Sequence, residues 1–368
     1  MRREGFGRRE PEIGGEDRRK SLKRCLYGMR YTFRAMKKTV FSHVLLCGVG
    51  VALAALSAGA QSLLVINQGD KDMSIVDPAT GKQVATVDEG VTDVHVHEVA
   101  ASSDGKTAWM PIYGSTGVGH AGIDGHEMIV VDLASRKIIG HVDWGHGVRP
   151  HDPVFDRKRD LLYVTTELDK AVTVINPKTM KIVGQVPTGQ PESHMLALSH
   201  DGRLGYTANV GPGTVSVLDM VHRKLITVIP ISANTQRISI SPNDKWVFTS
   251  DQTKPQLAVI DTVTNKVTKW VPLPGKGYGT ASTLDGRWLL VAVPHTNQVA
   301  VVDLNTMQVV RSIDVPKAPQ EILVRPDDKV AYVSCSGAGQ VAAIDLTDWK
   351  VTQTIDAGRG SDGLAWAK

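Results

Sequence analysis

The stretch HMLALSHDGRLGYTANVGPGTVSVLDMVHRKLITVI, residues 194–229, contains four short apolar segments separated by turn-forming residues. Within the segments, apolar and β-branched residues alternate with polar ones, which is the pattern of a β-strand with one buried face. The Asp-Gly pair at 201–202 supplies the backbone freedom that a tight hairpin turn needs. The stretch therefore predicts four consecutive strands, at 195–199, 204–208, 214–218 and 224–229.

The third of these strands recurs along the chain as a short run of β-branched residues that ends in Asp or Asn. Seven copies end at Asp77, Asp132, Asn176, Asp219, Asp261, Asp303 and Asp345. After a first interval of 55 residues, the spacing is 44, 43, 42, 42 and 42. Four strands in a repeat of this length are typical of a propeller blade. We therefore predict an all-β fold, a seven-bladed β-propeller with four antiparallel strands per blade.

The two ends of the repeat region complement each other. The first unit begins at Leu63 with a segment that matches a second strand, and the last unit ends at Gly363–Trp366 with a segment that matches a first strand. A C-terminal strand that completes the first blade closes the ring and leaves no unpaired edge there. We therefore expect residues 61–368 to form one closed propeller domain.

Residues 36–60 have the three-part order of a secretory signal peptide. A basic start at Met36 precedes a mostly apolar run, and small residues at 58–60 mark a cleavage site before Gln61. We expect a periplasmic or secreted protein without a stable membrane span, the alternative being an uncleaved anchor. The basic segment 1–35 is interpreted as a disordered extension or as the product of a start codon assigned too early.

The charge and the cysteine content indicate which kinds of partner and cross-link to expect. The whole chain has a formal net charge of +4, but residues 1–60 carry 13 Lys and Arg against 5 Asp and Glu. The remainder has 29 basic and 33 acidic residues, a net charge of −4, which gives no electrostatic reason to expect binding to nucleic acid or an anionic membrane. Cys335 is the one cysteine after residue 60, so no intramolecular disulfide is expected there.

A Ser-x-Asp-Gly-Lys/Arg turn, an aromatic-containing second strand such as Leu162-Tyr163-Val164 or Ala331-Tyr332-Val333, and a Val-x-Val-Ile/Leu-Asp third strand recur together. In these features residues 62–368 resemble the YVTN-type β-propeller repeat family. They are similar to YncE-like periplasmic proteins and to the haem-binding propeller of cytochrome-type nitrite reductases. The resemblance implies the fold, but propellers of this kind serve as binding modules, lyases, lactonases and haem or metal platforms.

Histidines gather on one face of the predicted propeller. Eight of the 11 that follow residue 60 fall in or next to the second-to-third loops and the fourth-to-first connections, which share a face. When the blades are aligned on the turn after the first strand, the position five residues before its Ser equivalent is polar in every blade. It holds His97, His151, His194, Gln236, Tyr278, Gln320 and Asp362. Because first strands line the channel of a propeller, these residues are expected to form a polar ring at its mouth.

His97, His151 and His194 belong to adjacent blades at the same level. Imidazole is a common ligand of zinc, copper and iron, and three His with an open position are typical of catalytic metal sites. We predict that these three residues hold a transition metal (Cu, Zn or Fe) or a haem-like group. Two alternatives stay open, namely a solvated polar ring and acid–base catalysis without a metal.

Further candidates flank the ring. Two residues before it stand His95, Arg149 and Glu192, which we expect to bind ligand together with Gln236, Tyr278, Gln320 and Asp362. Glu98, Asp152 or Glu192 could orient the imidazoles. The Gly-rich segment Tyr113–Glu127 is about 12 residues longer than its counterparts and is expected to act as a lid. Its His120 and His126 would complete a metal shell, the alternative being a tolerated surface insertion.

The sequence therefore predicts an exported, monomeric propeller that binds a metal, a haem-like cofactor or a small ligand at a His-rich channel mouth. Whether it catalyses a reaction is left open, and no catalytic residue is assigned. The alternatives are a non-catalytic scaffold for a protein or peptide partner and a metal-dependent lyase or lactonase.

Overall fold

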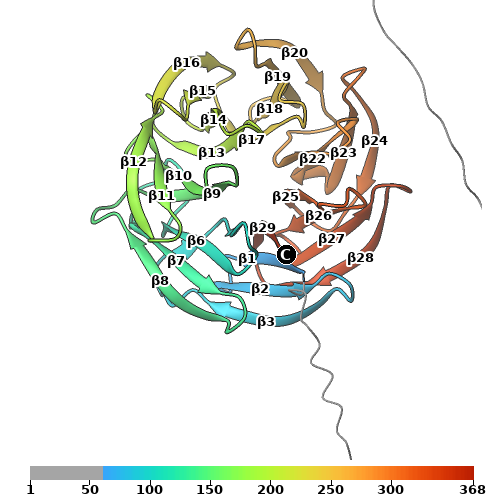
Figure 1. Cartoon of the computed structure of the whole chain (residues 1–368). Coiled ribbons are helices and arrows are strands. Elements are labelled where there is room, and N and C mark those ends of the chain that lie inside the picture. Colours follow the sequence, from blue (N-terminus) through green and yellow to red (C-terminus); the bar gives the residue numbers. More distant parts are fainter. Residues whose placement is uncertain (1–60) are drawn as a thin grey trace, which may run out of the picture. The chain divides into compact units, whose positions relative to one another are not determined.

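The computed structural model describes residues 61–368, in which seven blades, each a small antiparallel sheet, surround a central axis (Figure 1). This confirms the predicted seven-bladed β-propeller with antiparallel four-stranded blades. The C-terminal strand β29 (Ser361–Ala367) pairs with β1 (Ser62–Asn67) and completes the first blade, as the complementary ends predict. The predicted extension 1–35 and the predicted signal peptide 36–60 lie outside the described residues.

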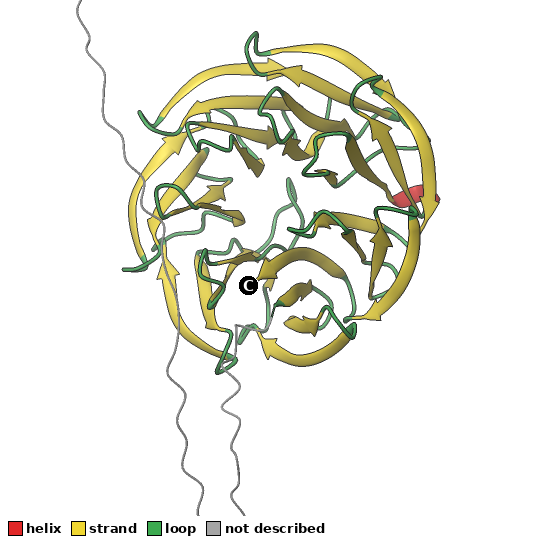
Figure 2. Cartoon of the chain, turned by 45° about the vertical axis from the view of Figure 1, so that its right-hand side comes forward, coloured by secondary structure: helices red, strands yellow, loops and turns green. Residues whose placement is uncertain are grey.

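The blades follow one another in sequence, and loops join the strands within and between them (Figure 2). Blade 1 adds β2 (Asp72–Asp77) and β3 (Lys82–Asp88) to β29 and β1. Blade 2 contains β4 (His95–Val96), β5 (Ala100–Ala101), β6 (Thr107–Gly114), β7 (Glu127–Asp132) and β8 (Lys137–Asp143). Blade 3 contains β9 (Pro150–Asp156), β10 (Leu161–Thr166), β11 (Ala171–Asn176) and β12 (Lys181–Pro187).

The remaining blades repeat this order. Blade 4 contains β13 (Ser193–Leu198), β14 (Leu204–Asn209), β15 (Thr214–Asp219) and β16 (Lys224–Pro230). Blade 5 contains β17 (Thr235–Ile240), β18 (Trp246–Asp251), β19 (Gln256–Asp261) and β20 (Lys266–Pro272). Blade 6 contains β21 (Thr280–Ser282), β22 (Trp288–Val293), the 3₁₀ turn η1 (Pro294–Thr296), β23 (Gln298–Asp303) and β24 (Gln308–Asp314). Blade 7 contains β25 (Pro319–Val324), β26 (Val330–Cys335), β27 (Gln340–Asp345) and β28 (Lys350–Asp356).

The Asp or Asn that ends each third strand has a structural role. The Asp77 carboxylate accepts a hydrogen bond from the backbone N–H of Ala79, and Asp219 and Asp345 do the same two residues on. A side chain that accepts from the backbone two residues later stabilises a tight turn. The repeated signature therefore marks the hairpin between third and fourth strands rather than a site of chemistry.

The hydrophobic core lies between blades rather than within any one of them. Seven clusters of buried residues span the described part of the chain, and each joins two neighbouring blades. The cluster between blades 7 and 1 contains Tyr332 and Trp366, whose rings stack with their centroids 6.0 Å apart. Because each blade buries its faces only against its neighbours, closure by β29 is needed to cover both ends of the repeat.

Bulges in the innermost strands aim polar side chains toward the channel. In β13 the register shifts between Ser193 and Met195, so His194 falls out of the ladder. The same shift brackets Gln236 in β17, Gln320 in β25 and Asp362 in β29. A bulge leaves its extra residue unpaired and turns the side chain away from its usual direction.

No helix among residues 61–368 is long and apolar enough to cross a membrane.

Candidate functional site

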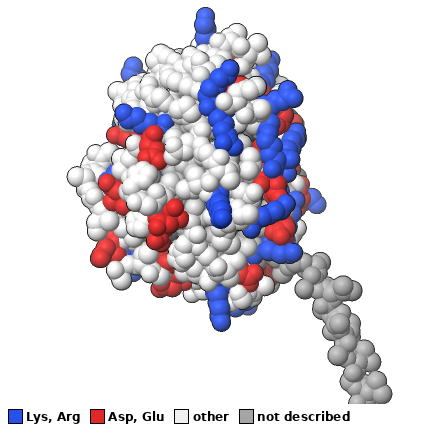
Figure 3. Space-filling model, turned by 60° about the vertical axis from the view of Figure 1, so that its left-hand side comes forward, with Lys and Arg blue, Asp and Glu red and all other residues white. Residues whose placement is uncertain are grey.

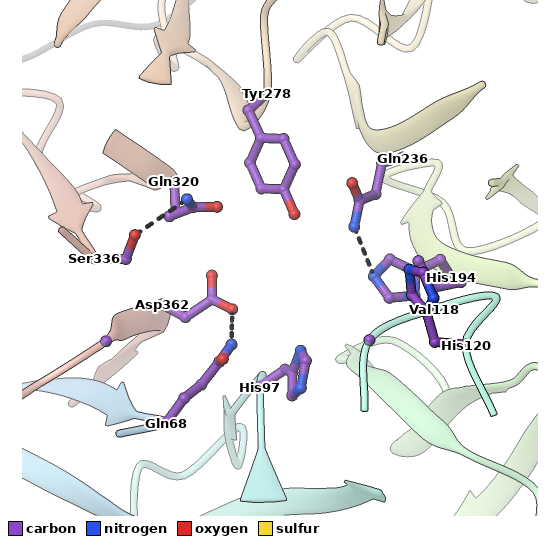
Figure 4. Close-up of a pocket in the computed structure, with 12 residues that line it drawn as sticks. Gln68, His97, Val118, His120, His194, Gln236, Tyr278, Gln320, Ser336 and Asp362 are labelled. Atoms are coloured by element: carbon purple, nitrogen blue, oxygen red, sulfur yellow. Dashed lines mark hydrogen bonds between the residues drawn. The ribbon is translucent and has the colours of Figure 1, made fainter. Parts of the chain in front are cut away.

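The ring position predicted from the sequence surrounds a pocket of about 340 Å³ at one end of the channel (Figure 4). Six of its seven residues line this pocket, namely His97, His194, Gln236, Tyr278, Gln320 and Asp362. Gln68, Ser336 and the insertion residues Val118 and His120 complete most of the wall. In Figure 4 the side chains of Gln236 and Tyr278 point toward the open centre from one side, and His97 and Asp362 face them from the other.

His151, the seventh ring residue, does not line the pocket but lies against the other two imidazoles. Its ring centroid is 3.6 Å from that of His194 and 5.3 Å from that of His97. Tyr113 packs beside all three, at 4.8 Å from His97, 5.1 Å from His151 and 6.0 Å from His194. The structure therefore gathers the three predicted histidines and one tyrosine into a single aromatic cluster.

Glu167 fixes the orientation of His194. Its Oε1 pairs with His194 Nδ1, and its Oε2 accepts a 2.8 Å hydrogen bond from the hydroxyl of Tyr113. Glu167 is 2% exposed and comes from the turn after β10, so three blades meet at one carboxylate. Donation from Nδ1–H leaves the lone pair of His194 on Nε2, which lies 3.3 Å from the amide nitrogen of Gln236 at the pocket wall.

The other two histidines present nitrogens without partners. His97 Nε2 and both ring nitrogens of His151 are inaccessible to solvent and make no hydrogen bond. Burial, reinforced by the other histidines nearby, holds the pKa of His97 and of His151 well below the usual range. Both rings are therefore neutral at pH 7, which is the form of imidazole that ligates metals. Buried polar nitrogens are normally hydrogen-bonded, so these three atoms are free to pair with a ligand or an ordered water.

A largely buried ion-pair network centres on Arg237, which directly follows the ring residue of blade 5. Arg237 Nη2 donates to Asp362 at 2.8 Å, and its Nη1 lies 2.7 Å from Glu98 and 3.7 Å from Glu321. The guanidinium also lies 5.1 Å from the centre of the Tyr278 ring. Burial raises the pKa of Glu98, Glu321 and Asp362. The charge of Arg237 lowers these pKa values, but by less than burial raises them. One arginine from blade 5 thus links carboxylates of blades 1, 2 and 7 across the axis.

The insertion between β6 and β7 folds back over the mouth. Gly114 forms a bridge with Asp124, and Arg149 donates to the Asp124 carboxylate and, at 2.7 Å, to the carbonyl of His120. These contacts place Gly117, Val118 and His120 in the pocket wall. The structure therefore uses Arg149 to hold the insertion, whereas the sequence predicted that this arginine would bind ligand directly.

The remaining predicted residues lie around the pocket rather than in its wall. His95 stacks on His97 with 4.8 Å between centroids, and Glu192 accepts a hydrogen bond from the N–H of Gly211 at 2.7 Å. Of the predicted orienting groups, Glu98 pairs with Arg237, and Asp152 accepts from the Leu196 N–H at 2.7 Å.

His126 is exposed and pairs with Asp143 on the outer part of blade 2, away from the pocket wall. Among residues 61–368, the one group of three His, Cys, Asp or Glu residues whose donor atoms all lie within 4.8 Å of one another is His126, Glu127 and Asp143. The imidazoles of His97, His151 and His194 pack closely but do not meet this criterion. A bare metal ion held by these three residues therefore stays a prediction.

Three residues of the site escaped the sequence analysis: Tyr113, Glu167 and Arg237. Nothing in the local sequence sets Glu167 apart from the acidic residues of other turns. Arg237 directly follows the ring residue of its strand, and Glu98, Asp152 and Glu321 occupy the same position in other blades. Charged residues at this position in four of the seven blades were thus readable from the same alignment.

One family model matches part of the chain. Residues 156–283, which include Glu167, His194, Arg237 and Tyr278, match the family model of the cytochrome D1 haem domain. No curated protein matches the sequence.

Three solved structures share the fold. The chain resembles the Kuenenia stuttgartiensis hydrazine synthase at 19% identity, with a TM-score of 0.67 over 77% of this chain and 92% of that one. A functionally unknown protein from Desulfotomaculum acetoxidans is similar at 12% identity, with a TM-score of 0.69 over 83% of this chain and 98% of that one. The dihydro-haem d1 dehydrogenase NirN in complex with DHE is similar at 12% identity, with a TM-score of 0.60 over 82% and 74%. At these identities the structures establish the β-propeller fold, and the family match shows that residues 156–283 are similar to the cytochrome D1 haem domain.

Proposed function

We propose that this propeller binds a haem-like tetrapyrrole at the mouth of its channel, with His194 as the ligand of the iron. The observation that carries the proposal is the pairing of His194 Nδ1 with the buried carboxylate of Glu167. An imidazole that ligates a metal characteristically donates its other ring N–H to a carboxylate, which fixes the ring and raises its basicity. The match to the cytochrome D1 haem domain spans both residues and supports a haem-like ligand.

The surrounding donors fit such a group. His97 lies in the pocket wall on the same side as His194, and its Nε2 has no hydrogen-bond partner, so it could accept a hydrogen bond from the ligand. Gln236, Tyr278 and Gln320 offer amide and phenol groups that suit the polar substituents of a tetrapyrrole. An iron tetrapyrrole would supply a one-electron redox centre when bound.

The size of the pocket assigns a role to the insertion. A volume of about 340 Å³ is at the lower end of the range for pockets that bury a small organic ligand. A large flat ligand therefore requires the segment that carries Val118 and His120 to move outward, as a lid does. Arg149 and Asp124 would hold this segment in the closed position.

Charge and export complete the proposal. On the face shown in Figure 3, acidic and basic side chains are mixed rather than gathered into one patch of a single sign, which does not favour a nucleic-acid surface.

We propose that the protein is exported through the segment 36–60 and acts in the periplasm or outside the cell. Sequencing the N-terminus of the protein recovered from the periplasm tests this, since cleavage at the expected site leaves Gln61 first.

The ligand is tested by titrating the purified full chain with haemin and following the Soret band. Wild-type protein is expected to bind one haemin with a shifted Soret maximum, and His194→Ala is expected to lose the shift. His222→Ala is the matched control, because His222 is an exposed histidine paired with Asp219 on the opposite face. Retention of the wild-type spectrum and affinity by His194→Ala would rule out its assignment as ligand.

A further inference from the structure

A second cluster of donor groups lies on the outer part of blade 2. Glu127 begins β7 and Asp143 ends β8, and the two face each other as directly paired residues of the hairpin. His126 immediately precedes Glu127, and His141 stands two residues before Asp143. We call these four residues, His126, Glu127, His141 and Asp143, the rim cluster.

The equivalent position in other blades shows how a carboxylate there can be satisfied without a metal ion. At the equivalent cross-strand position, blade 6 pairs Gln298 with Asp314 and blade 7 pairs Gln340 with Asp356. In both, the glutamine amide donates to the carboxylate at 2.9 Å. Blade 2 has Glu127 in place of the glutamine, so two carboxylates face each other. Like charges directly opposite on a hairpin are unfavourable. Blade 1 also pairs two carboxylates, Asp72 and Asp88, and there Asn67 donates to Asp72. In blade 2 the groups beside the two carboxylates are instead the imidazoles of His126 and His141.

The distances within the rim cluster suit a metal ion. His126 Nδ1 lies 3.0 Å from Asp143 Oδ1 and 3.9 Å from Glu127 Oε1, and His141 Nδ1 lies 3.3 Å from Glu127 Oε2. Tetrahedral zinc with ligands near 2.1 Å separates its donor atoms by about 3.4 Å. One ligand atom each from His126, Glu127 and Asp143 already lies within 4.8 Å of the other two.

We propose that the rim cluster is a binding site for a divalent transition metal of the zinc type, separate from the channel mouth. His126, Glu127 and Asp143 are the first three ligands, and His141 is the fourth. Two imidazoles and two carboxylates are the donor set that such ions share in proteins. All four side chains are accessible to solvent, so the ion can enter without unfolding the blade.

The position of the site gives the metal a structural effect. His126 ends the insertion whose residues 117, 118 and 120 form part of the pocket wall. The carbonyl of His126 accepts a hydrogen bond from the Trp144 N–H at 2.9 Å. The neighbouring Gly125 donates its N–H to the Tyr113 carbonyl and accepts from the Val148 N–H. A metal that ties His126 to β8 would therefore fix one end of the insertion and reduce its opening.

The test is zinc binding by the full chain, freed of metal with a chelator and titrated with ZnCl₂ at pH 7.5 by calorimetry. Bound zinc is then counted by mass spectrometry after gel filtration. The central variant is Glu127→Gln, which rebuilds the Gln–Asp pair that blades 6 and 7 already fold with. The double variant His126→Ala/His141→Ala removes the imidazoles. Controls are His222→Ala and the pocket variant His97→Ala/His194→Ala, with circular dichroism to confirm folding of each.

We expect one zinc ion in the wild type and in both controls, and at least a tenfold loss of affinity in Glu127→Gln and in the double variant. Zinc should also slow hydrogen exchange of residues 114–126 in the wild type and in His97→Ala/His194→Ala. Equal affinity in wild type and Glu127→Gln overturns the proposal, as does the absence of stoichiometric zinc in the wild type. Loss of zinc only in His97→Ala/His194→Ala also overturns it and moves the metal to the pocket. None of these results depends on whether haemin binds at the channel mouth.

Discussion

Blades 2, 3 and 4 place histidine at the ring position, whereas blades 5, 6, 7 and 1 place Gln236, Tyr278, Gln320 and Asp362 there. The backbone is similar in both halves, because a bulge or an irregular start of the innermost strand recurs around the ring. The chemistry differs, since one half supplies imidazoles and the other supplies amide, phenol and carboxyl groups. A nearly symmetric scaffold thus carries an asymmetric site, as expected where function is grafted onto a fold.

The two halves also differ in how their side chains are supported. Glu167 and Tyr113 support the histidine half through neutral and charged hydrogen bonds within blades 2 to 4. The other half depends on Arg237, which reaches across the axis to Glu98 and Asp362. The comparison predicts that disturbing the histidine half changes ligand affinity, and that disturbing Arg237 changes stability first.

The largest effect is expected from Arg237→Met. Removing the arginine leaves Glu98, Glu321 and Asp362 buried without their cation, and breaking a buried ion pair in this way costs about 3–5 kcal/mol of folding free energy. Urea denaturation at pH 7 measures the loss. Arg287→Met is the control, because Arg287 stacks on the Trp288 ring near the surface. A loss no greater than that of the control would show that the network does not stabilise the closed ring.

The next effect is expected from Glu167→Gln, which weakens the support of His194 without removing the imidazole. Loss of such a carboxylate partner lowers metal affinity about 10- to 100-fold. Haemin titration of the full chain measures it, with Glu192→Gln as the matched carboxylate variant that supports the Gly211 loop instead. Equal losses in the two variants would contradict a specific role for Glu167.

A third effect concerns pH. Burial raises the pKa of Asp152 to about 7, above its ordinary value, while the Leu196 N–H lowers it in part. The folded protein therefore keeps a proton that the unfolded chain releases, and this contribution to stability is lost as the pH rises from about 4 to about 7. Asp152→Asn should gain stability over the wild type across that window, measured as urea midpoints at pH 4.5 and 7.5.

His97 and His151 act in the opposite direction. Burial depresses the pKa values of these two histidines. The wild type and Asp152→Asn should therefore both lose stability as the pH falls below about 6.5. Because this loss is common to the wild type and Asp152→Asn, the difference between them isolates Asp152. A difference that does not change between pH 4.5 and 7.5 would mean that Asp152 is ionised throughout.

The smallest effect is expected from Tyr278→Phe in the half without histidines. Removing one phenol hydroxyl at the pocket wall deletes at most one hydrogen bond to the ligand, worth about 2- to 10-fold in affinity. The same haemin titration checks it. A loss as large as that of Glu167→Gln would remove the distinction between the two halves.

The fold could be predicted from the sequence because a propeller repeats local information. Each hairpin has its own turn residues, such as Asp201-Gly202 or the Asp at the end of a third strand, and the interval of about 42 residues sets the blade. Closure followed from complementary ends, and β29 with β1 confirms it. The ring position followed as well, since one offset in a regular repeat maps to one height in the channel.

The partners of the ring residues could not be predicted, because they come from other blades. Glu167 meets His194 across 27 residues and Tyr113 across 54, and Arg237 meets Asp362 across 125. Within one insertion, His120 reaches the pocket and His126 does not, because the Gly114–Asp124 bridge turns the segment back on itself. Sequence alone therefore determined the blades, their number and the height of the polar ring, all of which depend on local periodicity. Only the tertiary structure decided which side chains meet there, because the curvature of the ring brings distant residues within hydrogen-bond distance.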